Sequence, residues 1–138
     1  MSPTILVIDD EAVVRLMLQR LLKAEHLNVI VAADGREGFD LFRTCAPDLV
    51  ITDILMPGQE GIETIRRMRH ERPDAKIIAM SGGGRIKAQD LLLIAQRMGA
   101  DGALAKPFGR EELLAAIRSV LAVSNDDAPP AYDEGIAC

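Results

Sequence analysis

Five short, mostly apolar runs alternate along this chain with segments of helical periodicity, and this alternation limits its fold more than any other feature. The runs are Ile5–Ile8, Asn28–Ala32, Leu49–Ile51, Lys76–Met80 and Gly102–Ala105. Short apolar runs are typical of strands that are buried on both faces. Parallel strands joined by helices form one sheet with helices on both faces. The pattern predicts an α/β, flavodoxin-like, doubly wound sheet of five parallel strands in the order 2-1-3-4-5, with five helices.

Apolar residues recur at helical spacing in each intervening segment. They are Val14, Leu18, Leu21 and Leu22, then Phe39 and Phe42, then Ile62 and Ile65, then Leu91, Ile94, Ala95 and Met98, and finally Leu113, Ile117, Val120 and Leu121. Asp34 and Glu37 have the spacing of a capping box at the start of the second helix. The fourth helix is expected from about Ile86 to Met98, with Gly99 as its C-terminal cap.

The predicted fourth helix contains four consecutive apolar residues, Leu91–Ile94. Four residues cover about 300° of a helix surface, which is more than one core-facing stripe. With Ile94 in the core, Leu93 and Leu92 are expected to face outward as a surface for a partner protein. Packing of these residues against the preceding loop is the alternative, with nearly equal weight.

Composition and charge exclude several classes of protein. The chain has 138 residues and a net charge of −5, whereas domains that bind nucleic acid are usually basic. No signal peptide and no run long enough to span a membrane are found, so a cytoplasmic protein without a membrane partner is expected. Residues 3–123 form the predicted domain. Residues 124–138 lose periodicity and are predicted to be a disordered tail, too short to fold as an effector domain.

Acidic residues follow the first and third predicted strands. Asp9 and Asp10 come after the first strand and Asp53 after the third, on the two sides of the switch point where ligands bind in such sheets. Three carboxylates at one edge repel one another unless they take up protons or a cation. Mg²⁺ binds carboxylates, waters and phosphate oxygens. Taken alone, Asp9 and Asp10 would have a simpler explanation, as acidic residues that stabilise the N-terminus of the following helix.

Two more polar groups lie at the ends of predicted strands. Ser81 ends the fourth strand and Lys106 follows the fifth. Taken alone, Ser81 would be explained as a loop residue and Lys106 as a solvated surface lysine. A carboxylate nucleophile, a metal ion, a lysine and a hydroxyl group on one edge form a set suited to phosphoryl transfer.

These residues resemble the response-regulator receiver domain of two-component signalling over residues 3–123. The matching positions are Val7–Glu11, Asp53, Met56–Gly58, Gly61, Ser81, Gly99–Ala100 and Lys106–Phe108. The resemblance implies that Asp53 is the phosphoacceptor, and that Ser81 and Lys106 bind the phosphoryl oxygens. It also implies a cis bond between Lys106 and Pro107.

The resemblance further implies a set of ligands for Mg²⁺. Asp10 would bind the ion directly, Asp9 mainly through water, and Leu55 through its backbone carbonyl, beside Asp53. One position departs from the family, because Ala103 stands where an aromatic residue is common. The usual movement of a ring with the serine hydroxyl is therefore not expected here.

The expected function is that of a stand-alone phosphoacceptor, which receives a phosphoryl group from a histidine kinase or a histidine phosphotransfer protein. Output would come from altered protein contacts, in which the fourth helix takes part, or from onward phosphorelay. A phosphohydrolase with an aspartate nucleophile is the competing class. Such enzymes carry an acid–base aspartate two positions after the nucleophile, where this chain has Leu55, so no turnover enzyme is expected. An inactive scaffold is disfavoured because every phosphorylation residue is present.

A basic cluster lies in the predicted third helix. Because Glu63 and Arg67 are spaced as a helical ion pair, a solvated face is the expected explanation for it. The members of the cluster are Arg66, Arg67, Arg69, His70 and Arg72.

Overall fold

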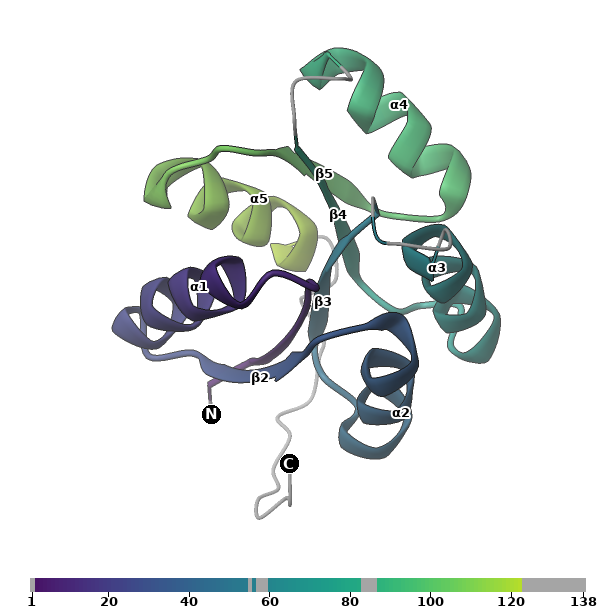
Figure 1. Cartoon of the computed structure of the whole chain (residues 1–138), viewed down its shortest axis with the longest axis horizontal. Helices are drawn as coiled ribbons and strands as arrows, with labels where there is room; N and C mark the ends of the chain where they lie inside the picture. Colours follow the sequence, from purple (N-terminus) through teal and green to yellow (C-terminus); the bar gives the residue numbers. More distant parts are fainter. Residues whose placement is uncertain (1, 55, 57–59, 83–86, 123–138) are drawn as a thin grey trace.

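The computed structural model describes residues 2–54, 56, 60–82 and 87–122, over which five strands alternate with five helices (Figure 1). The strands are β1 (Thr4–Ile8), β2 (Asn28–Ala32), β3 (Leu49–Asp53), β4 (Ile77–Ser81) and β5 (Gly102–Ala105). The helices are α1 (Ala12–Ala24), α2 (Gly35–Cys45), α3 (Glu60–Glu71), α4 (Ala88–Met98) and α5 (Arg110–Ala122). All neighbouring strands pair in parallel in the order β2-β1-β3-β4-β5, which confirms the predicted fold.

Helices cover both faces of the sheet (Figure 1). Successive residues of a strand point to opposite faces, so each strand serves two cores. Ile5 and Val7 of β1 pack with α1 and α5, on what we call the α1/α5 face. Leu6 and Ile8 pack with α2 and α3, on the α2–α4 face, where Ala95 of α4 is also buried. This alternation decides which face each residue at a strand end occupies.

Local signals in the sequence explain the helix ends. The Asp34 carboxylate accepts a hydrogen bond from the Glu37 N–H at 2.8 Å, and Glu37 Oε1 accepts one from the Ala33 N–H at 2.9 Å. Asp34 is thus confirmed as the N-cap residue, and the Glu37 side chain bonds the N–H of Ala33, one residue before the cap. Gly99 ends α4 with φ of +103°, in the left-handed region that glycine adopts without strain.

The predicted core face of α4 is partly wrong. Ile94 is 38% exposed, together with Leu93 at 52%, whereas Ala95 is fully buried. Ala95 lets the helix lie close to the sheet along a narrow stripe, and Ile94, about 100° away on the helix, falls outside that stripe. The exposure of Leu93 confirms its predicted orientation. The side chains of Leu91 and Leu92 lie outside the described residues.

The basic cluster of α3 is also more than a solvated face. Arg67 and Arg72 lie over the rings of Phe39 and Phe42 respectively, each 4.2 Å from the ring centre. Arg69 donates to backbone carbonyls in other parts of the fold. Arg67 is exposed, as expected of a solvated face, whereas Arg69 and Arg72 are half-buried. The expected solvated face is therefore wrong for Arg69 and Arg72, because long arginine side chains reach groups that sequence neighbours do not indicate.

Some predicted features lie outside the described residues. These are the loop at Pro57–Gly58, the glycines Gly83–Gly84, the helix start at Ile86 and the tail 124–138. β4 begins one residue later than expected and includes Ser81. No helix in the described part of the chain is long and apolar enough to cross a membrane.

Candidate functional site at the strand ends

The acidic residues converge because β1 and β3 are neighbours in the sheet. Ile8 of β1 lies opposite Thr52 of β3, so Asp9 and Asp53 are adjacent at the next step. Asp9 continues the series of Ile5 and Val7, and Asp53 that of Leu49 and Ile51, all on the α1/α5 face. Both carboxylates are buried, with 0% exposure for Asp9 and 5% for Asp53. The predicted meeting of these residues is therefore found.

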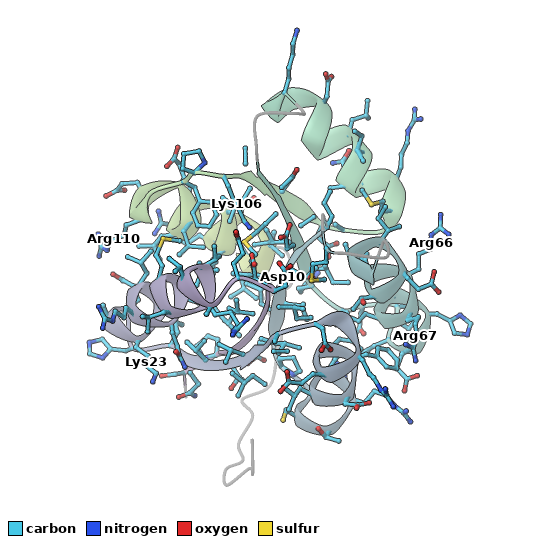
Figure 2. All side chains as sticks on the ribbon, in the orientation of Figure 1. Asp10, Lys23, Arg66, Arg67, Lys106 and Arg110 are labelled. Atoms are coloured by element: carbon cyan, nitrogen blue, oxygen red, sulfur yellow. The ribbon has the colours of Figure 1, made fainter. Side chains whose placement is uncertain are left out.

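Lys106 joins these two carboxylates from the far side of the site. Its Nζ lies 2.8 Å from Asp9 Oδ2 and 3.3 Å from Asp53 Oδ2. Glu11 Oε1 is a further 3.7 Å contact, on a largely exposed side chain. A peptide bond in the cis form joins Lys106 to Pro107, as expected. Figure 2 shows Lys106 and Asp10 near the middle of the view, while Arg66 and Arg67 lie on the outer side of α3.

The two carboxylates hold the ammonium group of Lys106 in its charged form. Burial lowers the pKa of Lys106, but its hydrogen bond to Asp9 and the charges of Asp53 and Asp9 outweigh that effect, so the pKa is raised above 10.5. Lys106 therefore stays protonated at neutral pH. A protonated lysine beside Asp53 provides a fixed positive charge where a negatively charged ligand would bind.

Backbone contacts orient Asp9. Its Oδ1 accepts a hydrogen bond from the Glu11 N–H at 2.9 Å, and its carbonyl accepts one from Arg15 Nη1 at 2.7 Å. The chain thus turns at the end of β1 so that Oδ2 remains directed at Lys106. Glu11 and Arg15 belong to the start of α1, and the acidic run Asp9–Glu11 is the only signal in the sequence for this arrangement.

Three carboxylates form a candidate cation site. One oxygen from each of Asp9, Asp10 and Asp53 lies within 4.8 Å of the others, and Asp10 is exposed. Hard oxygen ligands of this kind fit Mg²⁺, which keeps several waters and so suits a site open on one side. Leu55, whose carbonyl is the fourth predicted ligand, lies outside the described residues.

Ser81 occupies the opposite side of the site. It continues the series of Ile77 and Ala79, which belong to the α2–α4 face. The side chain is buried, with 4% exposure, and its hydroxyl has no hydrogen-bond partner among the described residues. Buried hydroxyl groups normally have a partner. The strand that ends in this unpartnered hydroxyl lies between β3, which ends in Asp53, and β5, which precedes Lys106. This position fits a site that binds an oxygen-rich ligand such as a phosphoryl group.

Two glycines lie at positions around the site where a side chain would crowd neighbouring atoms. A Cβ at Gly61, on α3, would lie 2.4 Å from the Asp53 carbonyl oxygen and 2.5 Å from the Ile54 Cα. A Cβ at Gly82 would lie 3.1 Å from Cδ of Lys106. In the sequence, Gly61 stands out only through the family motif, and Gly82 only as part of a glycine run. Neither close approach can be inferred from residue order, because each depends on the folded path of the chain.

The fold and site together define a flavodoxin-like domain with an acidic site at its switch point. The family model for the response regulator receiver domain matches residues 5–118. The chain belongs to this family, which acts in two-component signalling and in which phosphorylation and magnesium binding are typical.

Relatives and solved structures agree with the family assignment. Response regulator MprA of Mycolicibacterium vanbaalenii is 38% identical over 127 residues, which cover 92% of this chain and 54% of that protein. The chain thus spans about half the length of the curated relatives it matches. A putative response regulator from Chloroflexus aurantiacus has a TM-score of 0.80 at 30% identity, over 88% of this chain and 99% of that one. Chemotaxis protein CheY4 of Vibrio cholerae has a TM-score of 0.78 at 28% identity, over 88% and 100%.

Proposed function

We propose that the domain accepts a phosphoryl group on Asp53 from a histidine kinase or a histidine phosphotransfer protein, and signals through altered protein contacts or onward relay. The observation that carries this proposal is the contact of Lys106 with Asp53 at 3.3 Å, together with the unpartnered hydroxyl of Ser81 at the end of the neighbouring strand β4. A phosphoryl group on Asp53 adds charged oxygens at that point. A lysine and a hydroxyl donor are the groups that bind such oxygens.

In the transfer step, an oxygen of Asp53 forms a bond to phosphorus as the bond from phosphorus to the donor imidazole nitrogen breaks. The electron pair of the broken bond stays with the imidazole. Lys106 neutralises part of the charge on the transferred oxygens, and Ser81 donates a hydrogen bond to one of them. Mg²⁺, held by Asp9, Asp10 and Asp53 with the Leu55 carbonyl, would supply further charge neutralisation and orientation when bound.

The same residues support a phosphoacceptor and not a turnover phosphohydrolase. Position 55, where a phosphohydrolase of the aspartate type carries its acid–base carboxylate, is leucine. The only chemistry we propose beyond acceptance is slow loss of the phosphoryl group from Asp53. A stand-alone role without a further domain stays a prediction, as does a cytoplasmic location.

Intact-mass measurement with a small phosphodonor tests the proposal. We expect a mass increase of one phosphoryl group in the presence of Mg²⁺, and little increase in EDTA. Asp53→Asn should abolish the increase. Asp48→Asn, an exposed aspartate just before β3, is the matched control and should label like the wild type. Labelling that persists in Asp53→Asn would show that the phosphoryl group is carried elsewhere.

A further inference from the structure

The turn between β1 and α1 carries two of the three converging carboxylates, and it is not held by an ordinary helix cap. Glu11 is the N-cap residue of α1, and its side chain makes no capping hydrogen bond. A capping side chain normally bonds a free N–H group at the start of a helix and so fixes the chain that enters it. The conformation of this turn therefore depends on other contacts.

Asp9 makes these contacts through both its backbone and its side chain. Its N–H donates to the Ala32 carbonyl at 3.2 Å. Its two carboxylate oxygens accept hydrogen bonds from the Glu11 N–H at 2.9 Å and from Lys106 Nζ at 2.8 Å. Its carbonyl accepts one from Arg15 Nη1 at 2.7 Å. Arg15 is thus the side chain that bonds the peptide group by which the chain leaves Asp9.

The orientation of that peptide group determines the direction of Asp10. A peptide group is planar, so a hydrogen bond to the Asp9 carbonyl also fixes the N–H and Cα of Asp10. The Asp10 side chain is exposed, and within the described part of the chain it makes no hydrogen bond or ion pair. One of its carboxylate oxygens nevertheless lies within 4.8 Å of oxygens of Asp9 and Asp53. The direction of this carboxylate therefore depends on the backbone, which Arg15 holds.

We propose that Arg15 is a positioning residue for Mg²⁺, because it holds the peptide group between Asp9 and Asp10 so that the Asp10 carboxylate faces the cation site. A guanidinium has no acceptor atom for a cation, and its positive charge by itself would repel one. The two effects have opposite signs. Positioning predicts that loss of Arg15 weakens Mg²⁺ binding, whereas repulsion alone predicts that it strengthens binding. The inference rests on the cation site of the proposed function and does not require transfer to Asp53.

Calorimetric titration with Mg²⁺ decides between the two effects. Arg15→Met removes the donor and keeps an unbranched side chain, and it should weaken Mg²⁺ binding by about tenfold, as is typical for groups that orient metal ligands. Arg15→Lys keeps the charge and a donor, and it should recover most of the loss, because the contact is a single hydrogen bond. Arg20→Met, at an exposed arginine of the same helix, is the matched control and should bind Mg²⁺ like the wild type.

Hydrogen exchange without divalent cations tests the same turn before any ion binds. The Glu11 N–H, which donates to Asp9 Oδ1, should exchange at least about threefold faster in Arg15→Met, because a hydrogen bond from a charged donor is lost beside it. Amides of β3, which report global unfolding, should stay unchanged.

Three results would overturn the inference. The first is Mg²⁺ binding by Arg15→Met that is as tight as in the wild type or tighter. The second is faster exchange by the same factor at Glu11 and in β3, since that indicates a general loss of stability. The third is a wild-type protein that binds no Mg²⁺, which removes the cation site as well. Intact mass reports transfer to Asp53 separately, so a failure of the proposed function is distinguished from a failure of the role of Arg15.

Discussion

The two faces of the sheet contribute unequally to the site. On the α1/α5 face, Lys106 contacts Asp9 at 2.8 Å and Asp53 at 3.3 Å and neutralises part of their charge. On the α2–α4 face, Ser81 is buried with a hydroxyl that has no partner among the described residues. A buried charge without a partner costs far more free energy than a buried hydroxyl. The charged groups of the α1/α5 face are therefore partly paired in the free protein, whereas the Ser81 hydroxyl on the other face is available to a ligand.

This difference separates two tasks of the site. The charged side holds the Asp53 carboxylate in position, and its surroundings are the buried ends of β1 and β3. The hydroxyl side belongs to the face covered by α4, which exposes Leu93 and Ile94. Three substitutions test the comparison, beginning with the largest expected effect.

Replacement of Lys106 should disturb the charged side most. Lys106→Met removes the ammonium group that contacts the buried carboxylates of Asp9 and Asp53, so the free energy of unfolding should fall by about 2–4 kcal/mol. Urea denaturation without divalent cations measures this change. Mg²⁺ should restore part of the loss, because it neutralises the same carboxylates. Lys87→Met, at an exposed lysine, is the control and should change stability by less than about 0.5 kcal/mol. Equal effects of the two substitutions would mean that the contacts of Lys106 with Asp9 and Asp53 do not stabilise the fold.

A smaller effect is expected at the exposed carboxylate. Asp10→Asn removes one of three charges around the candidate cation site and should weaken Mg²⁺ binding by about tenfold or more. Glu11→Gln makes the same change one residue later, outside the three converging carboxylates, and should have a smaller effect. Calorimetric titration with Mg²⁺ compares the two variants. If both weaken binding equally, the cation lies elsewhere.

The smallest effect on stability is expected at Ser81. Ser81→Ala removes a hydroxyl without a partner, so the free energy of unfolding should change by less than about 0.5 kcal/mol. Thr52→Val is the matched control, since the buried Thr52 hydroxyl donates to the Asp53 carbonyl at 3.2 Å and its loss should cost about 1 kcal/mol. Urea denaturation gives both values. A loss at Ser81 as large as at Thr52 would show that its hydroxyl is bonded in the free protein.

Residue order alone was sufficient to predict the fold and which residues meet at the site. Alternating apolar runs and helical segments permit few topologies, and parallel strands bring their carboxyl ends to one edge. This rule is sufficient to place Asp9, Asp53 and Lys106 together at that edge. The N-cap at Asp34 and the glycine cap at Gly99 depend on neighbours in sequence, which is why both predictions hold.

Only the tertiary structure decided how these groups are paired and which helix surfaces are covered. Residue order contains no distance between positions far apart in the chain, so the pairing of Lys106 with Asp9 across 97 positions was not predicted. Arg69 reads as a surface residue because its partners Gly99 and Asp101 lie about 30 positions away. Ile94 reads as core because periodicity shows that a helix has an apolar stripe, whereas the width of the buried stripe depends on how closely Ala95 lets α4 approach the sheet.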